Sequence, residues 1–272
     1  IIKLIANDLE IGIETIIDGQ IIEEGSVAIN AKVFFEIIRK LPSDEVTISV
    51  DDNYVMNISG GKAKFNISAK PTEEFPFLPQ IVKNNNVTIS QFSLKEVIRQ
   101  TVFSISDNEN TKVMTGELFE VKGNKLKVVS LDGHRISIRN IELKNSYDEV
   151  SVIIPGKTLI EISKILNGGM DDDVNIYFTD KHALFEFENT IVLSRLIEGE
   201  YYKIDKMLSS DYETKLTVNK KEMLDCIDRT TLLIKESDKK PVIIDIKDDS
   251  MGFNMHSSIG SMDEEISATK EG

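Results

Sequence analysis

Apolar residues recur at helical spacing in two stretches of this chain that are copies of one another. Residues 26–41 read SVAINAKVFFEIIRKL, and residues 151–166 read SVIIPGKTLIEISKIL, at a constant offset of 125 residues. Each copy continues from a β-prone run into a predicted helix with one apolar stripe: Phe34, Ile37, Ile38 and Leu41 in the first, and Leu159, Ile162 and Leu166 in the second. One face of each helix is therefore expected to be core.

The opposite face of both predicted helices is charged. It carries Lys32, Glu36 and Arg39 in one copy and Lys157, Glu161 and Lys164 in the other. A charged helix face is usually only a solvated face. The recurrence of the same charges in two copies favours a second interpretation, which is a shared binding surface.

Alternation of apolar and polar residues predicts antiparallel strands after the first helix. Residues 46–50, 54–59 and 62–68 alternate in this way, with turn residues between them. The third run has an apolar face and a basic face: Ala63, Phe65 and Ile67 on one side, and Lys62, Lys64 and Asn66 on the other. We expect hairpins rather than parallel crossovers.

A second strand and helix unit also recurs. Residues 87–89 precede a predicted helix over 94–105, with Lys95 and Arg99 opposite its apolar stripe, and residues 216–219 precede a similar helix. These repeats predict at least three copies of one unit, each with two helices and antiparallel strands, which is an α+β fold. We place the domains at 1–86, 87–213 and 214–272. The chain opens at Ile1 without a methionine, so we expect a fragment.

Composition changes this picture in two ways. The net charge of −14, from 32 basic and 46 acidic residues, argues against nucleic acid unless the basic residues are clustered. Cys226 is the only cysteine and falls in an apolar helical stripe, so disulfides and thiolate metal clusters are excluded. No apolar run is long enough to cross a bilayer and no signal peptide pattern opens the chain. We expect a soluble, cytoplasmic protein without membrane partners.

Motifs typical of enzymes are scarce. The chain contains no GxxxxGK[ST], GxGxxG, HExxH or GxSxG pattern. Asp171, Asp172 and Asp173 suggest a Mg²⁺ site or, more simply, a solvated turn. The loop Asp132-Gly133-His134-Arg135 offers an acid, a base and a cation, so an enzyme that acts on a small ligand or by hydrolysis is one alternative. A purely structural repeat protein is another.

The same loop carries a specific resemblance. Residues 130–136 read SLDGHRI and closely resemble the TDGHRL signature of the middle domain of the bacterial β sliding clamp, the processivity subunit of DNA polymerase III. Residues 116–120, residues 152–155 and Asp8-Leu9-Glu10 resemble that family as well. The resemblance covers essentially the whole chain, and it implies that part of the first domain and the later part of the third are missing.

This resemblance implies a function without catalysis. Two protomers of three similar domains each would close head-to-tail into a ring around duplex DNA, and the ring would tether the replicative polymerase during DNA replication. Only the holoenzyme would be a DNA-directed DNA polymerase. Implied partners are a second copy of the chain, duplex DNA of any sequence and, through short peptide motifs, the DNA polymerase III alpha subunit, the clamp loader and repair polymerases. No cofactor or metal ion is implied.

The resemblance also assigns roles to particular residues. The DNA-facing residues would be Lys32, Arg39, Lys95, Arg99, Lys157 and Lys164. A pocket for partner peptides would be lined by Met114, Leu131, Gly133, His134, Arg135, Ile136, Tyr202, Lys206 and Met207, although Tyr202 stands where the family commonly has proline. The loop at 132–135 could instead be only a turn between strands.

Ring closure would use an edge strand and the end of a helix. The interface residues would be Lys62, Lys64, Phe65 and Ile67 in the first domain and Leu233 and Ile234 in the third, with Asp263, Glu264 and Glu265 as possible countercharges. Exposed edge strands favour pairing, and lysines on this one favour an acidic partner. Phe65 and Ile67 could equally be core residues of the first domain.

Overall fold

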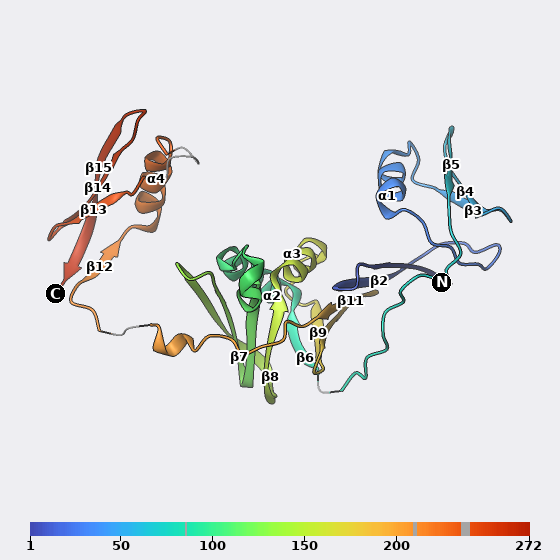
Figure 1. The fold of residues 1–272 in the computed structure, drawn as a ribbon, viewed down its shortest axis with the longest axis horizontal. Helices are drawn as coiled ribbons and strands as arrows, with labels where there is room; N and C mark the ends of the chain where they lie inside the picture. Colours follow the sequence, from blue (N-terminus) through green and yellow to red (C-terminus); the bar gives the residue numbers. More distant parts are fainter. Residues whose placement is uncertain (85, 209–210, 235–239) are drawn as a thin grey trace. The chain divides into compact units, whose positions relative to one another are not determined.

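The computed structural model of this chain describes residues 1–84, 86–208, 211–234 and 240–272. It consists of two units, unit 1 (Ile1–Tyr201) and unit 2 (Tyr202–Gly272), drawn in Figure 1. All strand pairs among the described residues are antiparallel. Helices combined with antiparallel sheets confirm the predicted α+β class.

A six-stranded sheet joins the two ends of unit 1. Its strands, in spatial order, are β1 (Ile2–Asn7), β2 (Ile11–Ile17), β11 (Thr190–Arg195), β10 (His182–Phe187), β9 (Asp173–Phe178) and β6 (Val87–Ser90). β2 pairs with β11, with Ile13 opposite Val192. At this seam the Thr15 and Thr190 hydroxyls lie 2.8 Å apart in a hydrogen bond. The sheet therefore continues across residue 86, where the sequence predicts a domain boundary.

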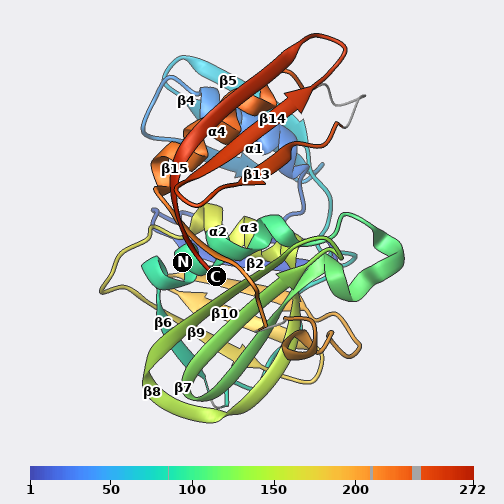
Figure 2. The same cartoon turned by 90° about the vertical axis from the view of Figure 1, so that its left-hand side faces the viewer.

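Two helices and a long hairpin share one core with this sheet. The helices α2 (Gln91–Thr101) and α3 (Gly156–Ile165) lie side by side (Figures 1 and 2), and the hairpin consists of β7 (Gly116–Leu131) and β8 (Ile136–Pro155). Buried members of the core are Leu94, Val97, Ile98, Phe119, Leu159, Ile162, Leu166, Val174 and Phe185. The apolar stripes predicted for both helices are thus confirmed.

The helix predicted over 94–105 has different ends. It begins three residues earlier, at Gln91, because the Ser90 hydroxyl caps it by accepting a hydrogen bond from the Ser93 N–H at 3.2 Å. It ends at Thr101, where a short 3₁₀ turn (η1, Val102–Ser104) follows and Ile105 is extended. The Thr101 hydroxyl bonds back to the Val97 carbonyl at 2.8 Å, an interaction that competes with regular helix pairing.

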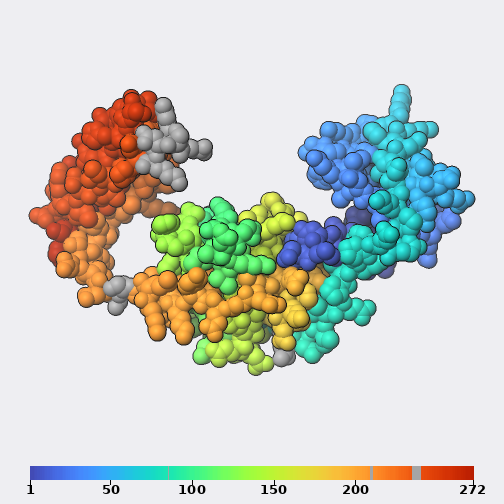
Figure 3. All heavy atoms as spheres, viewed as in Figure 1, coloured from blue at the N-terminus to red at the C-terminus, as the bar shows by residue number. Residues whose placement is uncertain are grey.

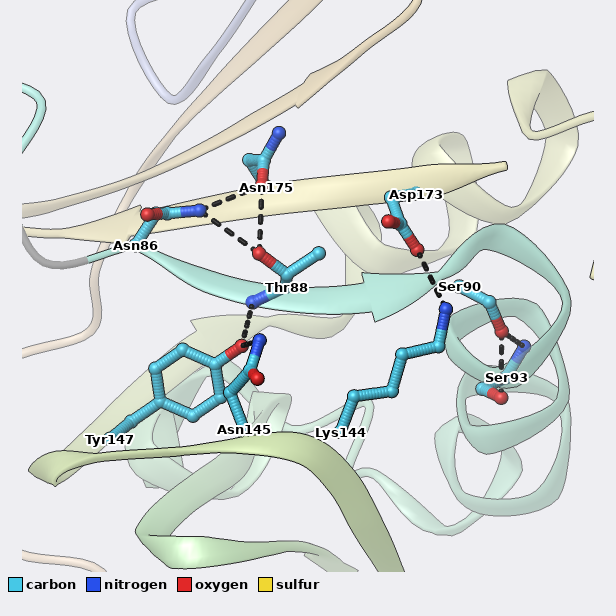
Figure 4. A network of polar contacts seen from close by, with 9 residues as sticks. All are labelled: Asn86, Thr88, Ser90, Ser93, Lys144, Asn145, Tyr147, Asp173 and Asn175. Atoms are coloured by element: carbon cyan, nitrogen blue, oxygen red, sulfur yellow. Dashed lines mark hydrogen bonds and ion pairs between the residues drawn. The ribbon is translucent and has the colours of Figure 1, made fainter. Parts of the chain in front are cut away.

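A polar network fastens the hairpin to the sheet (Figure 4). The Tyr147 hydroxyl of β8 accepts a hydrogen bond from the Thr88 N–H of β6 at 3.1 Å. The Thr88 hydroxyl donates to Asn175 of β9 at 2.9 Å, and the Asn86 amide donates to both Thr88 and Asn175. Polar groups on three strands are satisfied together, which fixes β6 between the sheet and the hairpin.

The first helix of unit 1 packs on a smaller sheet. Helix α1 (Ala31–Lys40) starts where the Asn30 side chain accepts from the Val33 N–H at 3.0 Å. The sheet has the order β3 (Thr47–Val50), β4 (Val55–Gly60), β5 (Ala63–Ser68), which matches the predicted hairpins. Its core consists of Ile37, Met56, Ile58 and Ala69, with Phe34, Ile38, Leu41 and Ile67 packed against them.

Among its described residues, unit 2 contains one α-helix, the short 3₁₀ helix η3 (Ile204–Lys206) and one four-stranded sheet. The strand order is β12 (Lys215–Val218), β15 (Ser261–Glu271), β14 (Ser250–His256), β13 (Ile243–Ile246). Helix α4 (Lys220–Thr231) is capped by Asn219, which accepts from the N–H groups of Lys221 and Glu222. Cys226 is buried in the core of this unit, as predicted, together with Met251, Phe253, Ile266 and Ala268.

The described residues contain no candidate membrane span and no candidate metal cluster. No helix there is long and apolar enough to cross a membrane. No group of three or more His, Cys, Asp and Glu side chains in the same ranges is arranged to hold a metal ion. Asp171 and Asp172 lie in a bend that leads into β9, and Asp173 is the first residue of that strand. The Asp172 carbonyl accepts from the Gln91 N–H at 2.7 Å. That position fits the solvated turn.

Candidate nucleic-acid and partner interfaces

Basic side chains recur on the outer faces of three helices. Lys32 and Arg39 lie on α1, Lys95 and Arg99 on α2, and Lys157 and Lys164 on α3. All are exposed except Lys95, which is half-buried. Lys157 and Lys164 are seven residues apart, about 10 Å along the helix at 1.5 Å per residue. Figure 3 shows α2 and α3 at the surface of unit 1.

Each of these helices pairs one basic residue with a glutamate three positions earlier. The pairs are Glu36–Arg39 at 3.2 Å, Glu96–Arg99 at 2.7 Å and Glu161–Lys164 at 2.8 Å. The Arg99 hydrogen bond lowers the pKa of Glu96. Exposed pairs of this kind contribute roughly 0 to 1 kcal/mol. The cations can therefore exchange a glutamate for a phosphate at little cost.

Two of the six basic residues also have partners elsewhere in unit 1. Lys95 Nζ donates to the Leu166 carbonyl oxygen at 2.8 Å, and Lys157 Nζ lies 3.1 Å from Asp8 Oδ2. Lys32 has no ion-pair partner within the ranges that the structure describes. The six residues are therefore not equivalent, since Lys95 is engaged by a backbone carbonyl and the others sit at the surface.

The loop that carries the sequence signature is a tight turn between β7 and β8. Asp132 Oδ1 accepts hydrogen bonds from the N–H groups of His134 and Arg135 at 3.0 and 3.2 Å, and Asp132 Oδ2 pairs with Arg135 Nε at 2.9 Å. The His134 hydrogen bond, above all, lowers the pKa of Asp132. Gly133 has a φ of 91°, which favours glycine. Asp132 is thus a carboxylate that holds the turn, and it is a poor proton acceptor.

The residues predicted to line a peptide pocket fall in both units. In unit 1, His134 and Arg135 are exposed, Met114 and Ile136 are half-buried, and Leu131 is buried, so Leu131 supports the turn from inside. Met114 belongs to the 3₁₀ segment η2 (Glu109–Thr115). In unit 2, Tyr202, Lys206 and Met207 are exposed at and around the short helix η3 (Ile204–Lys206). The combined pocket stays a prediction.

The residues predicted for ring closure lie at element ends and edges. β5 is an edge of its three-stranded sheet, with Lys62, Lys64 and Phe65 exposed and Ile67 packed on the core below. Leu233 and Ile234 follow the end of α4 and are half-buried. Of the possible countercharges, Glu264 already pairs with Arg229 and Glu265 with Lys247. No ion pair of Asp263 occurs within the described ranges.

The sequence did not predict that one titratable residue, Glu117, is buried in the core. Glu117 on β7 is fully buried, and burial raises its pKa to about 8. Glu117 Oε2 lies 3.0 Å from the Thr101 hydroxyl oxygen in a hydrogen bond, whereas Oε1 has no hydrogen-bond partner among the described residues. Burial therefore favours the protonated, neutral form of this carboxyl. Its neighbours Leu118 and Phe119 are apolar, and a strand interrupted by one glutamate gives no periodic signal of burial.

Comparisons with known proteins agree with one another. The sequence profile of the DNA polymerase III beta subunit, central domain, matches residues 88–203, and that of the N-terminal domain matches residues 1–79. A curated relative, the beta sliding clamp of Staphylococcus aureus, is 34% identical over 265 residues, which are 96% of this chain and 70% of the relative.

Solved structures show the same similarity. The DNA polymerase sliding clamp of Bacillus subtilis superposes with a TM-score of 0.91 at 34% identity, over 99% of this chain and 74% of the other. A protein assigned as a DNA polymerase III beta subunit from Eubacterium rectale gives a TM-score of 0.95 at 61% identity, over 99% and 73%. Both the sequence and the fold thus point to one family.

Proposed function

Because the chain belongs to the family of bacterial β sliding clamps, the beta subunits of DNA polymerase III, we propose that its basic helix residues face duplex DNA. The chain is a non-catalytic processivity clamp for DNA replication. Clamps of this family work with DNA and polymerase as dimeric rings.

One observation carries the DNA assignment, namely the same charge arrangement on three helices. Each of α1, α2 and α3 presents a basic residue paired with a glutamate three positions before it. Contacts to phosphates carry no sequence information, so such a lining attracts every stretch of duplex equally. The internal glutamates shorten the residence at any one phosphate, because they compete for the same cations. This arrangement suits sliding rather than stationary binding.

A pair of neutral substitutions tests this assignment. Lys157→Gln combined with Lys164→Gln should weaken DNA binding and reduce the slope of log affinity against log salt by about 1 to 2, since two phosphate contacts are lost. Neutral changes are preferred at Lys157 because a glutamate there would lie against Asp8. Lys122→Gln combined with Lys144→Gln, which removes two exposed lysines of β8 and its partner β7, is the matched control. An equal slope for both double variants would refute the assignment.

We further propose that the domains run over 1–86, 87–213 and 214–272. The two family profiles, which end at residues 79 and 203, support this division. The helices α2 and α4 and the strands before them begin equivalent repeats at 87 and near 215. On this division the first and middle domains share the sheet that β2 and β11 join.

The partner pocket is proposed to use the turn after β7 and the residues around η3. Such a pocket would offer both apolar and polar side chains, and flexible Met114 and Met207 could repack around different peptides. The bound peptides would come from the DNA polymerase III alpha subunit, the clamp loader and repair polymerases. The rigid Asp132 turn, held by three hydrogen bonds, supports this role because it presents His134 and Arg135 in fixed positions.

The dimer contact is proposed to pair β5 of one protomer with the third domain of its partner. Phe65 is exposed on an edge strand, and Lys62 and Lys64 flank it. Ile67 packs on the core of its own domain and so anchors β5 to that core. Leu233 and Ile234 would meet this edge from the partner. The lysines oppose pairing of β5 with its own copy and so favour head-to-tail closure.

A further inference from the structure

A cavity of about 310 Å³ lies in unit 1 where three segments meet. These are the turn between β1 and β2, the segment 76–79 that follows the small sheet, and the adjacent strands β10 and β11. Leu193 and Gly12 are buried at its base, and Leu78 covers Gly12 so closely that a Cβ there would come within 1.9 Å of Leu78 Cδ2. A cavity of this size is near the lower end of the range typical of ligand sites.

Hydrogen bonds hold the three walls together. The Asn7 side-chain amide donates to the Pro76 carbonyl oxygen at 2.7 Å, which ties the turn to the segment 76–79. The Arg195 N–H donates to the Glu10 carbonyl oxygen at 2.9 Å, which ties the same turn to β11. The cavity is therefore preorganised, and a ligand would bind without the free-energy cost of ordering the surrounding segments.

The rim offers two large apolar side chains to solvent. Leu9 is 71% exposed and Phe77 is 59% exposed. Leu9 also has a φ of 74°, a conformation that costs a leucine free energy and is compensated by its surroundings. The Asn7 side chain accepts from the Leu9 N–H at 2.8 Å, and Asp8 Oδ1 accepts from the N–H groups of Glu10 and Ile11. These hydrogen bonds therefore fix the turn in a conformation that exposes the Leu9 side chain to solvent.

The opposite side of the rim is basic. Lys181 and Arg195 are exposed there, and neither has an ion-pair partner in the part of the chain that the structure describes. His182 lies between them in the lining, and burial followed by the charges of Arg195 and Lys181 lowers its pKa. Glu10 is the one acidic side chain in the lining. In a chain with a net charge of −14, this local excess of cations favours an acidic ligand.

The turn at this cavity is the repeat counterpart of the signature turn. The pair Asn7–Gly12 closes one hairpin and Leu131–Ile136 closes the other, at an offset of 124 residues. Asp8 and Asp132 each accept two backbone N–H bonds, and the next residue has a positive φ in both turns. The same local structure therefore occurs twice, once beside this cavity and once at the proposed partner pocket.

We propose that this cavity is a second peptide site, which binds a short linear segment with a large apolar residue followed by acidic residues. The apolar side chain would enter between Leu9 and Phe77, over Leu193. The acidic residues would pair with Lys181 and Arg195. That the ligand is a peptide rests on the proposed function, because the turn resembles the one assigned to partner peptides; the apolar and basic lining does not depend on it.

The test uses a fluorescein-labelled peptide, acetyl-Ser-Leu-Phe-Asp-Glu, and a control with Lys-Lys in place of Asp-Glu. Binding to the chain is measured by fluorescence polarisation. Lys181→Gln combined with Arg195→Gln should weaken binding of the acidic peptide about tenfold or more, since two charge-assisted hydrogen bonds are lost. Leu9→Gly should weaken it as well while the chain melts at the same or a higher temperature, because glycine accepts a φ of 74° without strain.

The outcomes separate this site from the partner pocket. The proposal is supported if the acidic peptide binds more weakly to the Lys181→Gln and Arg195→Gln variant but equally well to the Met114→Glu and Met207→Glu variant. Loss only with the methionine variants overturns it and leaves the partner pocket standing. Binding that survives both sets of changes overturns both assignments for this peptide. Equal affinity for the acidic and the basic peptide also overturns the proposal, because the cations would then make no contribution.

Discussion

Lys95 Nζ donates a hydrogen bond of 2.8 Å to the carbonyl oxygen of Leu166, the C-cap residue of α3. The bond joins the two helices of the middle domain and places a positive charge at the negative end of the α3 dipole. Lys95 therefore stabilises the helix pair, whereas the other basic residues of these helices sit at the surface.

Replacing Lys95 by methionine should lower the free energy of unfolding by about 1 kcal/mol, because the stem still packs while the bond and the charge are lost. Lys164→Met is the matched control, since its partner Glu161 is exposed on the same helix. That change should cost less than about 0.5 kcal/mol. Urea unfolding at constant salt measures both, and equal losses would show that the bond to Leu166 adds nothing.

The buried Glu117 predicts a dependence of stability on pH. The pKa of Glu117 is about 8 in the folded chain, against an ordinary value of 4.5. The stronger proton binding of the folded chain therefore contributes fully to the free energy of unfolding below about pH 4.5. The free energy of unfolding then falls as the pH rises towards 8, because only the unfolded chain has released the proton. Above pH 8 the loss is complete, on the order of a few kcal/mol.

Glu117→Gln should remove this dependence, since glutamine stays neutral and can keep the bond to Thr101. At pH 8 the variant should be more stable than the parent chain by about 1 to 3 kcal/mol. Glu142→Gln, at an exposed position of β8, should change nothing. Thermal unfolding at pH 5, 6.5 and 8 provides the measurement. If the stability of Glu117→Gln and that of the parent chain changed with pH in the same way, Glu117 would be ionised in the folded chain.

The two edges of the small sheet offer a matched test of the dimer contact. Phe65 on β5 and Val50 on β3 are each 38% exposed. Phe65→Glu should convert the dimer to a folded monomer, because a charge would enter the proposed apolar contact beside Lys62 and Lys64. Val50→Glu should leave the dimer intact. Sedimentation velocity reports both masses, and a dimer that survives Phe65→Glu would exclude β5 from the interface.

The partner pocket predicts a loss of peptide binding without a loss of stability. Met114→Glu combined with Met207→Glu should weaken binding of a clamp-binding peptide from the DNA polymerase III alpha subunit by about tenfold or more, since a charge replaces each apolar contact. Met170→Glu is the control, because Met170 is exposed in the turn before β9. Calorimetric titration measures the affinities. Unchanged affinity in the double variant would show that neither methionine contacts the peptide.

Local features of the fold were predictable from the sequence. The apolar stripe of α3 and the alternation in β5 follow from side-chain periodicity, and the strand predicted at 62–68 is observed at Ala63–Ser68. For the aspartates at 171–173, the sequence favoured a solvated turn over a Mg²⁺ site because Gly168 and Gly169, which signal the end of the preceding helix, come just before them. The end of α2 was misplaced, since Ile105 continues the apolar spacing beyond the point where Thr101 closes the helix.

Contacts between distant residues gave no periodic signal. Lys157 pairs with Asp8 although 149 residues separate them, and β2 pairs with β11 across an even longer interval. A basic residue that looked solvated, Lys95, proved to be bound to a carbonyl of the neighbouring helix. The cavity between Leu9 and Arg195 depends on the same long-range pairing. Such features follow from tertiary packing, which local patterns do not encode.

The most direct test of the sliding clamp is its retention on DNA of different topology. The chain is loaded by a clamp loader onto nicked circular plasmid, separated from free protein at high salt, and then treated with a restriction enzyme that cuts the plasmid once. A ring held by topology should stay on the circle at salt concentrations that abolish phosphate contacts and should leave within minutes of linearisation. Loss from the circle as fast as from linear DNA, or retention that linearisation does not change, would contradict the account.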